Sequence, residues 1–330
     1  MLGSGHTTHQ GLQATIALAQ RADDLGFARY WMAEHHGVPG VASSAPTVMI
    51  GAIAAATRRI HVGSGGVMLP NHVPLVVAEQ FGTLASLYPG RIDLGVGRAI
   101  PEPLTAAVLQ RSLSRYGVDD FGQQIMQLAG FLSGDFPAGH SYREVFVSPH
   151  ADQPPAIWVL GASVGSANLA ATLGLPFAFA HHFGRGRAAE ALDRYRHNFR
   201  PSAAFSEPYG IVTAQVICAP TNEDAERIGK PAALMFLRMM RGQMGLMPSP
   251  EEVAAHRWTP EDLAFLHQRH HGQAVGSVAT VRAALGELLA TTGADELMMT
   301  TQMYSLDDRI RTLEQVGAMF VPELASAPSR

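Results

Sequence analysis

Short apolar segments alternate along this chain with Gly-rich or polar turns and with helical patterns that are apolar on one face. Near the start, an apolar stripe at helical spacing covers 12–25, Gly26 follows it, and the apolar and aromatic segment 28–33 comes next. Strands that alternate with helices predict a parallel sheet, because consecutive parallel strands need a crossover between them. Such a sheet is either closed as a barrel or open and doubly wound.

The number of strand-like segments favours the barrel. Seven are expected, at 28–33, 59–65, 91–97, 157–161, 177–181, 211–218 and 296–300. A final helix is predicted from the stripe formed by Leu306, Ile310, Leu313 and Phe320. Residues 1–8 are mostly Gly, His and Thr and lack the pattern of a buried strand. We therefore predict an α/β fold, a (β/α)8 TIM barrel with insertions, whose first strand is missing or truncated.

A chain of 330 residues suits one barrel, which typically needs about 250 residues before insertions. The Gly-, Pro- and His-rich segment 133–155 is expected to be an excursion across the barrel mouth. Capped helix starts at Ser249 and Thr259 place a helical insertion at about 240–275. With no linker pattern between them, residues 1–330 are expected to form a single domain.

Charge and cysteine content narrow the function classes. The net charge is −4, which gives no electrostatic basis for binding nucleic acid or an anionic membrane. Cys218 is the only cysteine, so neither an intrachain disulfide nor a structural cysteine–zinc site is expected. The start lacks a signal-peptide pattern, and the apolar stretch 46–56 is too short to span a bilayer. A cytoplasmic protein without a membrane partner is expected.

The first candidate site follows the strand at 28–33, where the sequence reads Glu34-His35-His36. In a parallel barrel, functional groups lie where the strands end. A carboxylate beside imidazoles suits acid–base catalysis, but it also suits metal ligation or a hydrogen-bonded structural cluster. These residues alone leave all three open, so a metal hydrolase is one alternative.

Three further strand ends carry weaker patterns. Gly65-Gly66 would let a flat ligand lie against the main chain, or would simply form a turn. Arg98 suits a phosphate or carboxylate, or an ion pair with a loop acid. The segment Gly161-Ala162-Ser163 up to Ser166 opens a helix, which favours either anion binding or ordinary capping.

Long blocks of this sequence resemble the luciferase-like monooxygenase family, in particular its "luciferase family oxidoreductase, group 1" branch. They are LGFARYWMAEHHGVPGVASSAP, RIHVGSGGVMLPNHVPLVVAEQFGTL and YPGRIDLGVGRA within 25–99, followed by 160–183, 199–203 and 293–301. Together they extend the resemblance across most of the chain, from residue 25 to residue 301. Two features depart from the family: the apolar first strand is absent, and the loop after Arg98 reads Ala-Ile-Pro-Glu-Pro instead of the more usual Ala-Pro-Gly-Thr-Asp-Pro.

The resemblance implies a monooxygenase that uses reduced FMN and O2 on a small organic substrate, with the flavin at the strand ends. It makes His35 the catalytic histidine, with Glu34 beside it, and assigns the flavin phosphate to Arg98 and to the turn containing Gly161, Ala162, Ser163 and Ser166. Gly65-Gly66 matches a non-prolyl cis peptide under the flavin ring. Deazaflavin F420 with a dehydrogenase or reductase activity, and a non-catalytic flavin-binding protein, are the alternatives.

The remaining expectations concern substrate and partners. Candidate substrate contacts, each with plain core packing or structural hydrogen bonding as its alternative, are Trp31, Met32, Met68, Asn71, His72, Phe179, His181 and His182. No Gly-x-Gly-x-x-Gly loop is placed to hold a nicotinamide dinucleotide, so a separate flavin reductase is expected as partner. Dimers packed through early helices are common in the family, so a homodimer is expected. No metal is expected.

Overall fold

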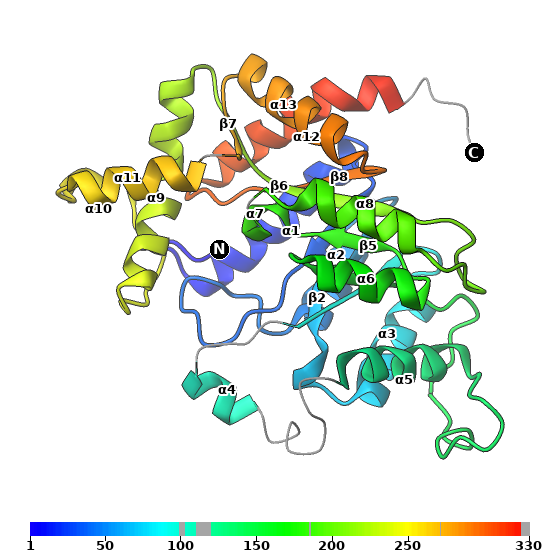
Figure 1. Cartoon of the computed structure of the whole chain (residues 1–330). Coiled ribbons are helices and arrows are strands. Elements are labelled where there is room, and N and C mark those ends of the chain that lie inside the picture. The colour runs from blue at the N-terminus through cyan, green and yellow to red at the C-terminus, as the bar shows by residue number, and fades with distance from the viewer. Residues whose placement is uncertain (99–102, 110–119, 185, 271, 325–330) are drawn as a thin grey trace.

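The computed structural model describes residues 1–98, 103–109, 120–184, 186–270 and 272–324. These residues form a curled parallel sheet wrapped by helices (Figure 1). Its strands are β1 (Arg29–Met32), β2 (His61–Met68), β3 (Ile92–Gly97), β4 (Ala156–Gly161), β5 (Phe177–Phe179), β6 (Gly210–Cys218), β7 (Ala274–Gly276) and β8 (Glu296–Thr300). All of their registered pairings are parallel. The predicted luciferase-like α/β barrel architecture is confirmed.

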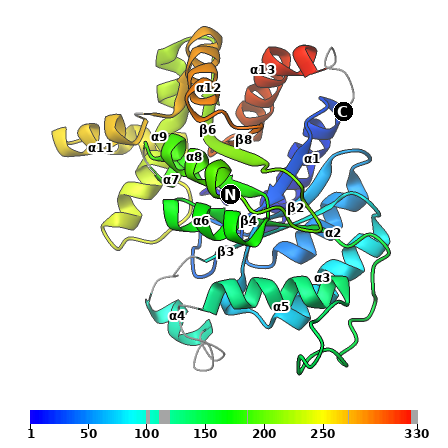
Figure 2. The same ribbon diagram turned by 45° about the vertical axis from the view of Figure 1, so that its right-hand side comes forward.

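Helices surround the sheet in both views, and a few of them project away from it (Figures 1 and 2). They are α1 (Thr8–Asp24), α2 (Pro46–Ala56), η1 (Leu69–Asn71, a 3-10 turn), α3 (Pro74–Leu87), α4 (Pro103–Leu109), α5 (Phe121–Ser133), α6 (Val164–Leu173), α7 (His181–Gly184), α8 (Ala188–Asn198), α9 (Asn222–Met240), α10 (Pro250–Ala255), α11 (Pro260–His270), α12 (Val278–Thr292) and α13 (Leu306–Leu324). Local sequence explains several starts. Thr7 and Ser249 each form a capping box, and Pro46, Pro74 and Pro250 occupy first-turn positions. No described helix is long and apolar enough to cross a membrane.

The strand order differs from the prediction at one point. The seven expected strands are β1 to β6 and β8, and they follow one another around the sheet in chain order, with β8 paired to β6. The additional strand β7 lies within the insertion expected at 240–275, and it pairs with the last residues of β6, from Val216 to Cys218. Three residues, Ala-Val-Gly, are too few to show a strand periodicity in sequence.

The expected absence of a first strand is observed in the described chain. Residues before α1 contribute only an isolated bridge between Gly3 and Met247. β1 pairs with β2 and β8 pairs with β6, but no described pairing joins β8 to β1. Residues of β3 and β6 are all buried, whereas every residue of β8 and most of β1 are only half-buried. The barrel is therefore open along one seam between these two strands.

A buried ion-pair network joins the two sides of this seam. Arg29 of β1 donates from Nε to Glu296 of β8 at 2.9 Å and from Nη1 to Asp93 of β3 at 2.7 Å. Trp31 donates its indole N–H to the same Asp93 carboxylate at 2.9 Å. Side chains thus close the part of the barrel that backbone pairing leaves open.

Strand alternation separates an outer core from an inner one. In β4, Ile157 and Val159 pack in the large cluster beneath the helices, while Trp158 and Leu160 join a smaller cluster inside the barrel. That inner cluster also contains Trp31 and Met298. The inner face therefore gives the barrel an aromatic and apolar floor.

The segment 133–155 does not cross the barrel mouth. It connects the end of α5 to the start of β4, so it lies at the amino ends of the strands. Its aromatic side chains fold back on α5, with the rings of Phe131 and Phe136 at 5.1 Å and those of Phe131 and Tyr142 at 5.8 Å. Only the second insertion, carrying α10 and α11, extends from the carboxyl-end side beside α9 (Figures 1 and 2).

Candidate active site

A buried carboxylate organises the loops that follow β1 and β2. Glu34 is 3% exposed and accepts hydrogen bonds from Nε2 of His36 and Nε2 of His72, each at 2.8 Å. It also accepts the backbone N–H of Met68 at 3.0 Å. Burial by itself opposes ionisation of Glu34, but the hydrogen bonds from His72 and His36 outweigh it and hold the pKa of this carboxyl below its ordinary value. Glu34 is thus an ionised anchor between two loops.

His35 is not the partner of Glu34. Its backbone N–H donates to the carbonyl of Ser43 at 3.1 Å, while its ring accepts and donates no hydrogen bond within the described chain and keeps contact with solvent. Desolvation by the surrounding protein lowers the pKa of His35, and His36 lowers it further, against the opposing charge of Glu34. Glu34 lies beside His35 in the sequence but does not hydrogen-bond to its ring, because His36 and His72 occupy the carboxylate.

The Gly65-Gly66 peptide is cis, as the resemblance implied. A Cβ on Gly66 would lie 2.8 Å from the carbonyl oxygen of Gly95, and a Cβ on Gly65 would lie 3.0 Å from Cβ of Trp31. Ser64 donates its hydroxyl to the same Gly95 carbonyl at 2.8 Å. The Gly95 backbone therefore requires glycine at position 66, and at position 65 a side chain would press against Trp31.

Arg98 and the start of α6 lie at the carboxyl ends of adjacent strands. The residues of β3 and β4 are in register at Val96 and Val159, Arg98 follows β3 directly, and Ser163 follows β4 after one intervening residue. The guanidinium of Arg98 lies 5.8 Å from the ring centre of Phe121. The backbone positions that carry these two groups therefore lie at neighbouring strand ends.

The Ser163 turn is also a helix cap. Ser163 accepts the N–H of Ser166 at 3.2 Å, and the Ser166 hydroxyl donates to the Ser163 carbonyl at 2.8 Å. A Cβ on Gly161 would lie 2.1 Å from the Ser166 hydroxyl oxygen, so glycine allows the helix to start this close to β4. Ala162 connects Gly161, the last residue of β4, to the cap residue Ser163. The turn therefore caps α6, as one of the two interpretations expected. The hydroxyls of Ser163 and Ser166 and the positive end of α6 remain at the mouth.

Two of the expected apolar contacts lie at or below the mouth. Trp31 faces the inside of the barrel with its ring 5.3 Å from that of Trp158. Met68 ends β2 beside Gly97, where a Cβ would lie 3.3 Å from Cε of Met68. Phe179 is different: it is fully buried in the outer core with Phe177, on the face opposite to Ala178. The expectation that Phe179 lines the cavity is wrong, because alternate residues of β5 face opposite sides.

The two histidines after β5 have defined polar contacts. His182 shares a hydrogen bond through Nδ1 with the Thr213 hydroxyl at 2.6 Å, and His181 donates from Nε2 to the Gly272 carbonyl at 3.1 Å. Burial lowers the pKa of His182 to about 4, and the positive charges of His181, Arg269 and His35 act in the same direction. His182 is therefore a neutral imidazole inside the mouth at neutral pH.

Arg269 is a polar residue of the mouth that no sequence pattern indicated. It comes from α11 in the insertion, and its guanidinium donates to the side-chain oxygens of Gln215 at 3.3 Å and Gln302 at 3.1 Å. It also stacks over the ring of Phe236, 3.6 Å from the centre. Nothing in the sequence around Arg269 indicates that α11 would reach the barrel, so only the fold could identify it.

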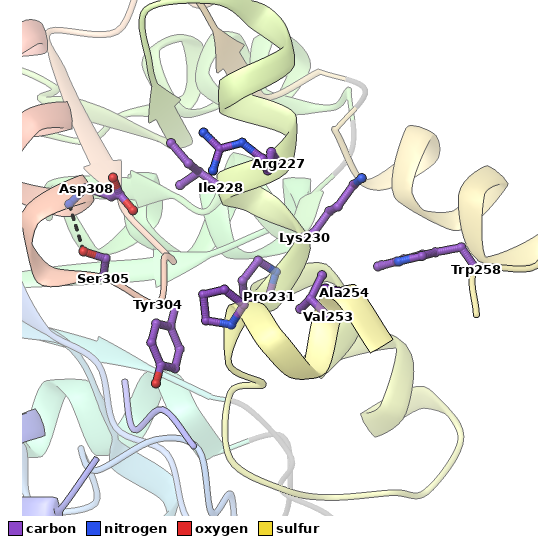
Figure 3. A pocket seen from close by; sticks show the side chains of 11 residues that line it. Arg227, Ile228, Lys230, Pro231, Val253, Ala254, Trp258, Tyr304, Ser305 and Asp308 are labelled. Atoms are coloured by element: carbon purple, nitrogen blue, oxygen red, sulfur yellow. Dashed lines mark hydrogen bonds between the residues drawn. The ribbon is translucent and has the colours of Figure 1, made fainter. Parts of the chain in front are cut away.

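A cavity of about 420 Å³ lies on the outer rim, between α9, α10 and the start of α13 (Figure 3). Its wall includes Ile228, Pro231, Trp258 and Tyr304, and it contains none of the residues described above. It is therefore separate from the strand ends where the candidate groups gather. Among the described residues, no three His, Cys, Asp or Glu side chains are arranged to hold a metal ion.

A parallel α/β barrel with candidate acid–base and anion-binding groups at its strand ends is typical of (β/α)-barrel enzymes. Residues 2–296 match the model of the luciferase-like monooxygenase family, and the chain belongs to this family of enzymes.

Several relatives match over most of the chain. The Bacillus subtilis protein YvbT is 42% identical over 314 residues, which is 95% of this chain and 92% of the relative. A luciferase-like monooxygenase of Escherichia coli K12 is 41% identical over 311 residues, covering 94% and 91%. The N-acetyl-S-alkylcysteine monooxygenase of Bacillus subtilis is 41% identical over 229 residues, covering 69% and 68%.

Solved structures agree with this assignment. Apo-MsnO8 has a TM-score of 0.87 at 38% identity, covering 97% of this chain and 95% of the other. The FMN-bound oxygenating constituent of 3,6-diketocamphane monooxygenase from Pseudomonas putida has a TM-score of 0.69 at 20% identity, covering 97% and 94%. An F420-dependent secondary alcohol dehydrogenase has a TM-score of 0.65 at 16% identity, covering 92% and 94%. The last two show the shared fold alone.

Proposed function

We propose that this enzyme is a monooxygenase that uses reduced FMN and O2 to oxidise a small organic molecule, with a separate reductase supplying the reduced flavin. One observation carries the cofactor part of the proposal: Arg98 and the start of α6 follow adjacent strands, and β2, which contains the Gly65-Gly66 peptide, pairs with the strand that precedes Arg98. The family of the chain supports the reaction class.

The residues at these three strand ends fit FMN. A phosphate needs charged and neutral hydrogen-bond donors, which Arg98, the hydroxyls of Ser163 and Ser166 and the positive end of α6 would supply. A flat ring system needs a surface without protruding side chains, which the main chain at Gly65-Gly66 would offer. Bound reduced FMN would supply the electrons that activate O2.

The protein's own groups would then handle protons and exclude water. His35 carries no hydrogen bond within the described chain and has a lowered pKa, so its neutral ring would take a proton from the reacting substrate. Glu34 would position the loop that carries His35, through His36 and His72. The apolar floor formed by Trp31, Trp158 and Met298 would hold the uncharged part of the substrate away from water.

Cofactor binding tests the first half of this proposal. The purified protein is titrated anaerobically with reduced FMN and, separately, with reduced F420. Reduced FMN is expected to bind, and Arg98→Met is expected to weaken it by roughly tenfold or more, because a hydrogen-bonded charge is removed. Arg194→Met, on the exposed face of α8, is the matched control and should not change the affinity. Preference for F420, or an unchanged affinity in Arg98→Met, would contradict the proposal.

Turnover tests the second half. The enzyme is supplied with an independent flavin reductase, NADH, FMN and O2, together with thioethers and ketones, beginning with N-acetyl-S-methyl-L-cysteine in view of the relative named above. An oxygenated product that depends on both FMN and O2 is expected. His35→Asn is expected to lower kcat/KM by roughly 10²–10⁴-fold with the FMN affinity unchanged. Flavin binding without any O2-dependent product would instead indicate a non-catalytic flavin carrier.

A further inference from the structure

The side chain of Arg269 is held in place at the barrel mouth by contacts with several elements. It is half-buried, its guanidinium lies flat over Phe236 of α9, and it donates to Gln215 of β6 and to Gln302 just after β8. These contacts come from three different elements, with the Arg269 side chain reaching them from α11. A long side chain held on both its flat face and its edge is fixed in one direction, which reduces the entropy lost when it binds a ligand.

The position of Arg269 relative to His182 follows from strand geometry. Thr213, which is bonded to His182, and Gln215, which is bonded to Arg269, are two residues apart on β6. Residues at this spacing point to the same face of a strand and lie about 7 Å apart along it. Arg269 and His182 therefore stand one above the other inside the barrel. The positive charge of Arg269 is among the groups that lower the pKa of His182, which agrees with this closeness.

Arg269 lies on a different arc of the mouth from the cofactor-phosphate groups. Arg98 follows β3 and Ser163 follows β4, whereas the partners of Arg269 belong to β6 and to the segment after β8. Adjacent strands are about 4.8 Å apart, so β3 and β6 are separated by roughly 14 Å along the sheet. Arg98 and the partners of Arg269 thus lie at the ends of different, non-adjacent strands of the mouth.

We propose that Arg269 binds the carboxylate of the substrate, so that this enzyme oxidises small organic acids whose uncharged part rests on the inner apolar floor. The inference rests on the proposed function, because it takes the Arg98 side of the mouth as the cofactor side. Guanidinium groups pair with carboxylates through two parallel hydrogen bonds, and such a pair fixes both the position and the orientation of a small molecule. His182 is the imidazole nearest to this anchor along β6, because its partner Thr213 lies two residues from Gln215.

Matched acid and amide probes test the charge requirement. Isothermal titration calorimetry is carried out with pentanoate and pentanamide, and with N-acetyl-S-methyl-L-cysteine and its primary amide. Each acid is expected to bind roughly 10- to 100-fold more tightly than its amide, since the amide keeps the shape and removes the charge. If no acid binds, or if acids and amides bind equally, the proposal is overturned.

Variants then assign the effect to Arg269. Arg269→Met keeps an apolar chain over Phe236 and is expected to abolish the acid-over-amide preference, whereas Arg194→Met on α8 should retain it. Because Arg269→Met could loosen α11, Gln302→Glu is the second variant: it leaves the stack intact and places a competing carboxylate beside the guanidinium. It too should remove the preference. A preference that survives either variant in a folded protein overturns the proposal.

The two proposals fail separately. FMN affinity is measured on the same variants and should be unchanged in Arg269→Met and reduced in Arg98→Met. A protein that prefers acids through Arg269 but does not bind reduced FMN would contradict the proposed function alone. A protein that binds FMN and oxygenates neutral substrates as well as acids would contradict only the role of Arg269.

Discussion

The imidazole Nε2 of His72 lies 2.8 Å from the Glu34 carboxylate and joins the loop after β1 to the 3-10 turn after β2. His36 approaches the same carboxylate from the other side at the same distance. Because Glu34 is buried and ionised, both histidines are held by one charge rather than by separate contacts. The two residues that flank His35, Glu34 and His36, are consequently both held in place by these hydrogen bonds.

Glu34→Gln should destabilise the protein by about 1–3 kcal/mol at pH 7, because the amide cannot accept all three of these hydrogen bonds as a charged group. The pKa of Glu34 is lowered in the folded state, so its contribution is present above the ordinary glutamate value of 4.5 and is lost as the pH falls through the folded value. Urea denaturation at pH 7 and pH 4 measures this. The difference between wild type and Glu34→Gln should shrink at pH 4, and Glu226→Gln, an exposed change on α9, should show no such trend.

His182 should make the folded state less stable in mildly acidic solution. Its pKa is lowered to about 4 by burial, so between pH 6.5 and 4 the unfolded chain binds a proton that the folded protein does not. The contribution of neutral His182 to the free energy of unfolding is therefore fully present above pH 6.5. It falls by at most about 3 kcal/mol as the pH approaches 4. His182→Gln should flatten this part of the pH–stability curve. If the curve of His182→Gln matches that of His197→Gln, an exposed change on α8, the interpretation is wrong.

Arg29→Met should cost about 3–5 kcal/mol, because it leaves the carboxylates of Asp93 and Glu296 buried without their cation. Chemical denaturation measures the loss. Arg58→Met, whose side chain is 82% exposed, should change stability by no more than about 0.5 kcal/mol. Combining Arg29→Met with Glu296→Gln should recover part of the loss. A small effect of Arg29→Met alone would show that the network does not hold the seam.

We expect a homodimer that uses the exposed apolar face of α2 and α3. Val48 of α2 is 71% exposed, and Val76 and Leu87 of α3 are 45% and 64% exposed, which is unusual for neighbouring helices of a monomer. Size-exclusion chromatography with light scattering should give a dimer for the wild type and a monomer for Val48→Glu combined with Val76→Glu. Val278→Glu on α12, also an exposed apolar position, should remain dimeric. A wild-type monomer would refute this interface.

The arrangement of strands was largely predictable because most of them are long and apolar. β3 and β6 are buried on both faces, and a strand buried on both faces of a parallel sheet is mostly apolar rather than alternating. β7 was not predictable, because three residues carry no period and its pairing with β6 depends on where the insertion folds. The place of 133–155 was predicted wrongly because composition cannot tell one end of a barrel from the other.

The candidate site was predictable where it depends on strand ends and unpredictable where it depends on orientation. Arg98 and Ser163 follow adjacent strands, as expected for functional groups at the carboxyl ends of a parallel sheet. The partners of Glu34 were not predictable, since His72 lies 38 residues away and only the fold makes it a closer partner than His35. The position of Arg269 was not predictable either, because its partners Gln215 and Gln302 lie 54 and 33 residues away in the sequence.

The open seam gives this barrel two ends, as in an ordinary sheet. About half of the amide groups on β1 and β8 point toward the seam, where no strand of the described residues pairs with them, so water reaches them when the side chains of Arg29 and Glu296 separate locally. Those amides should exchange their hydrogens long before the amides of β3, which are released only when the whole domain unfolds. Unfolding of this enzyme is therefore expected to start at the seam between β1 and β8. The strand ends of β3 and β4 should lose their structure last.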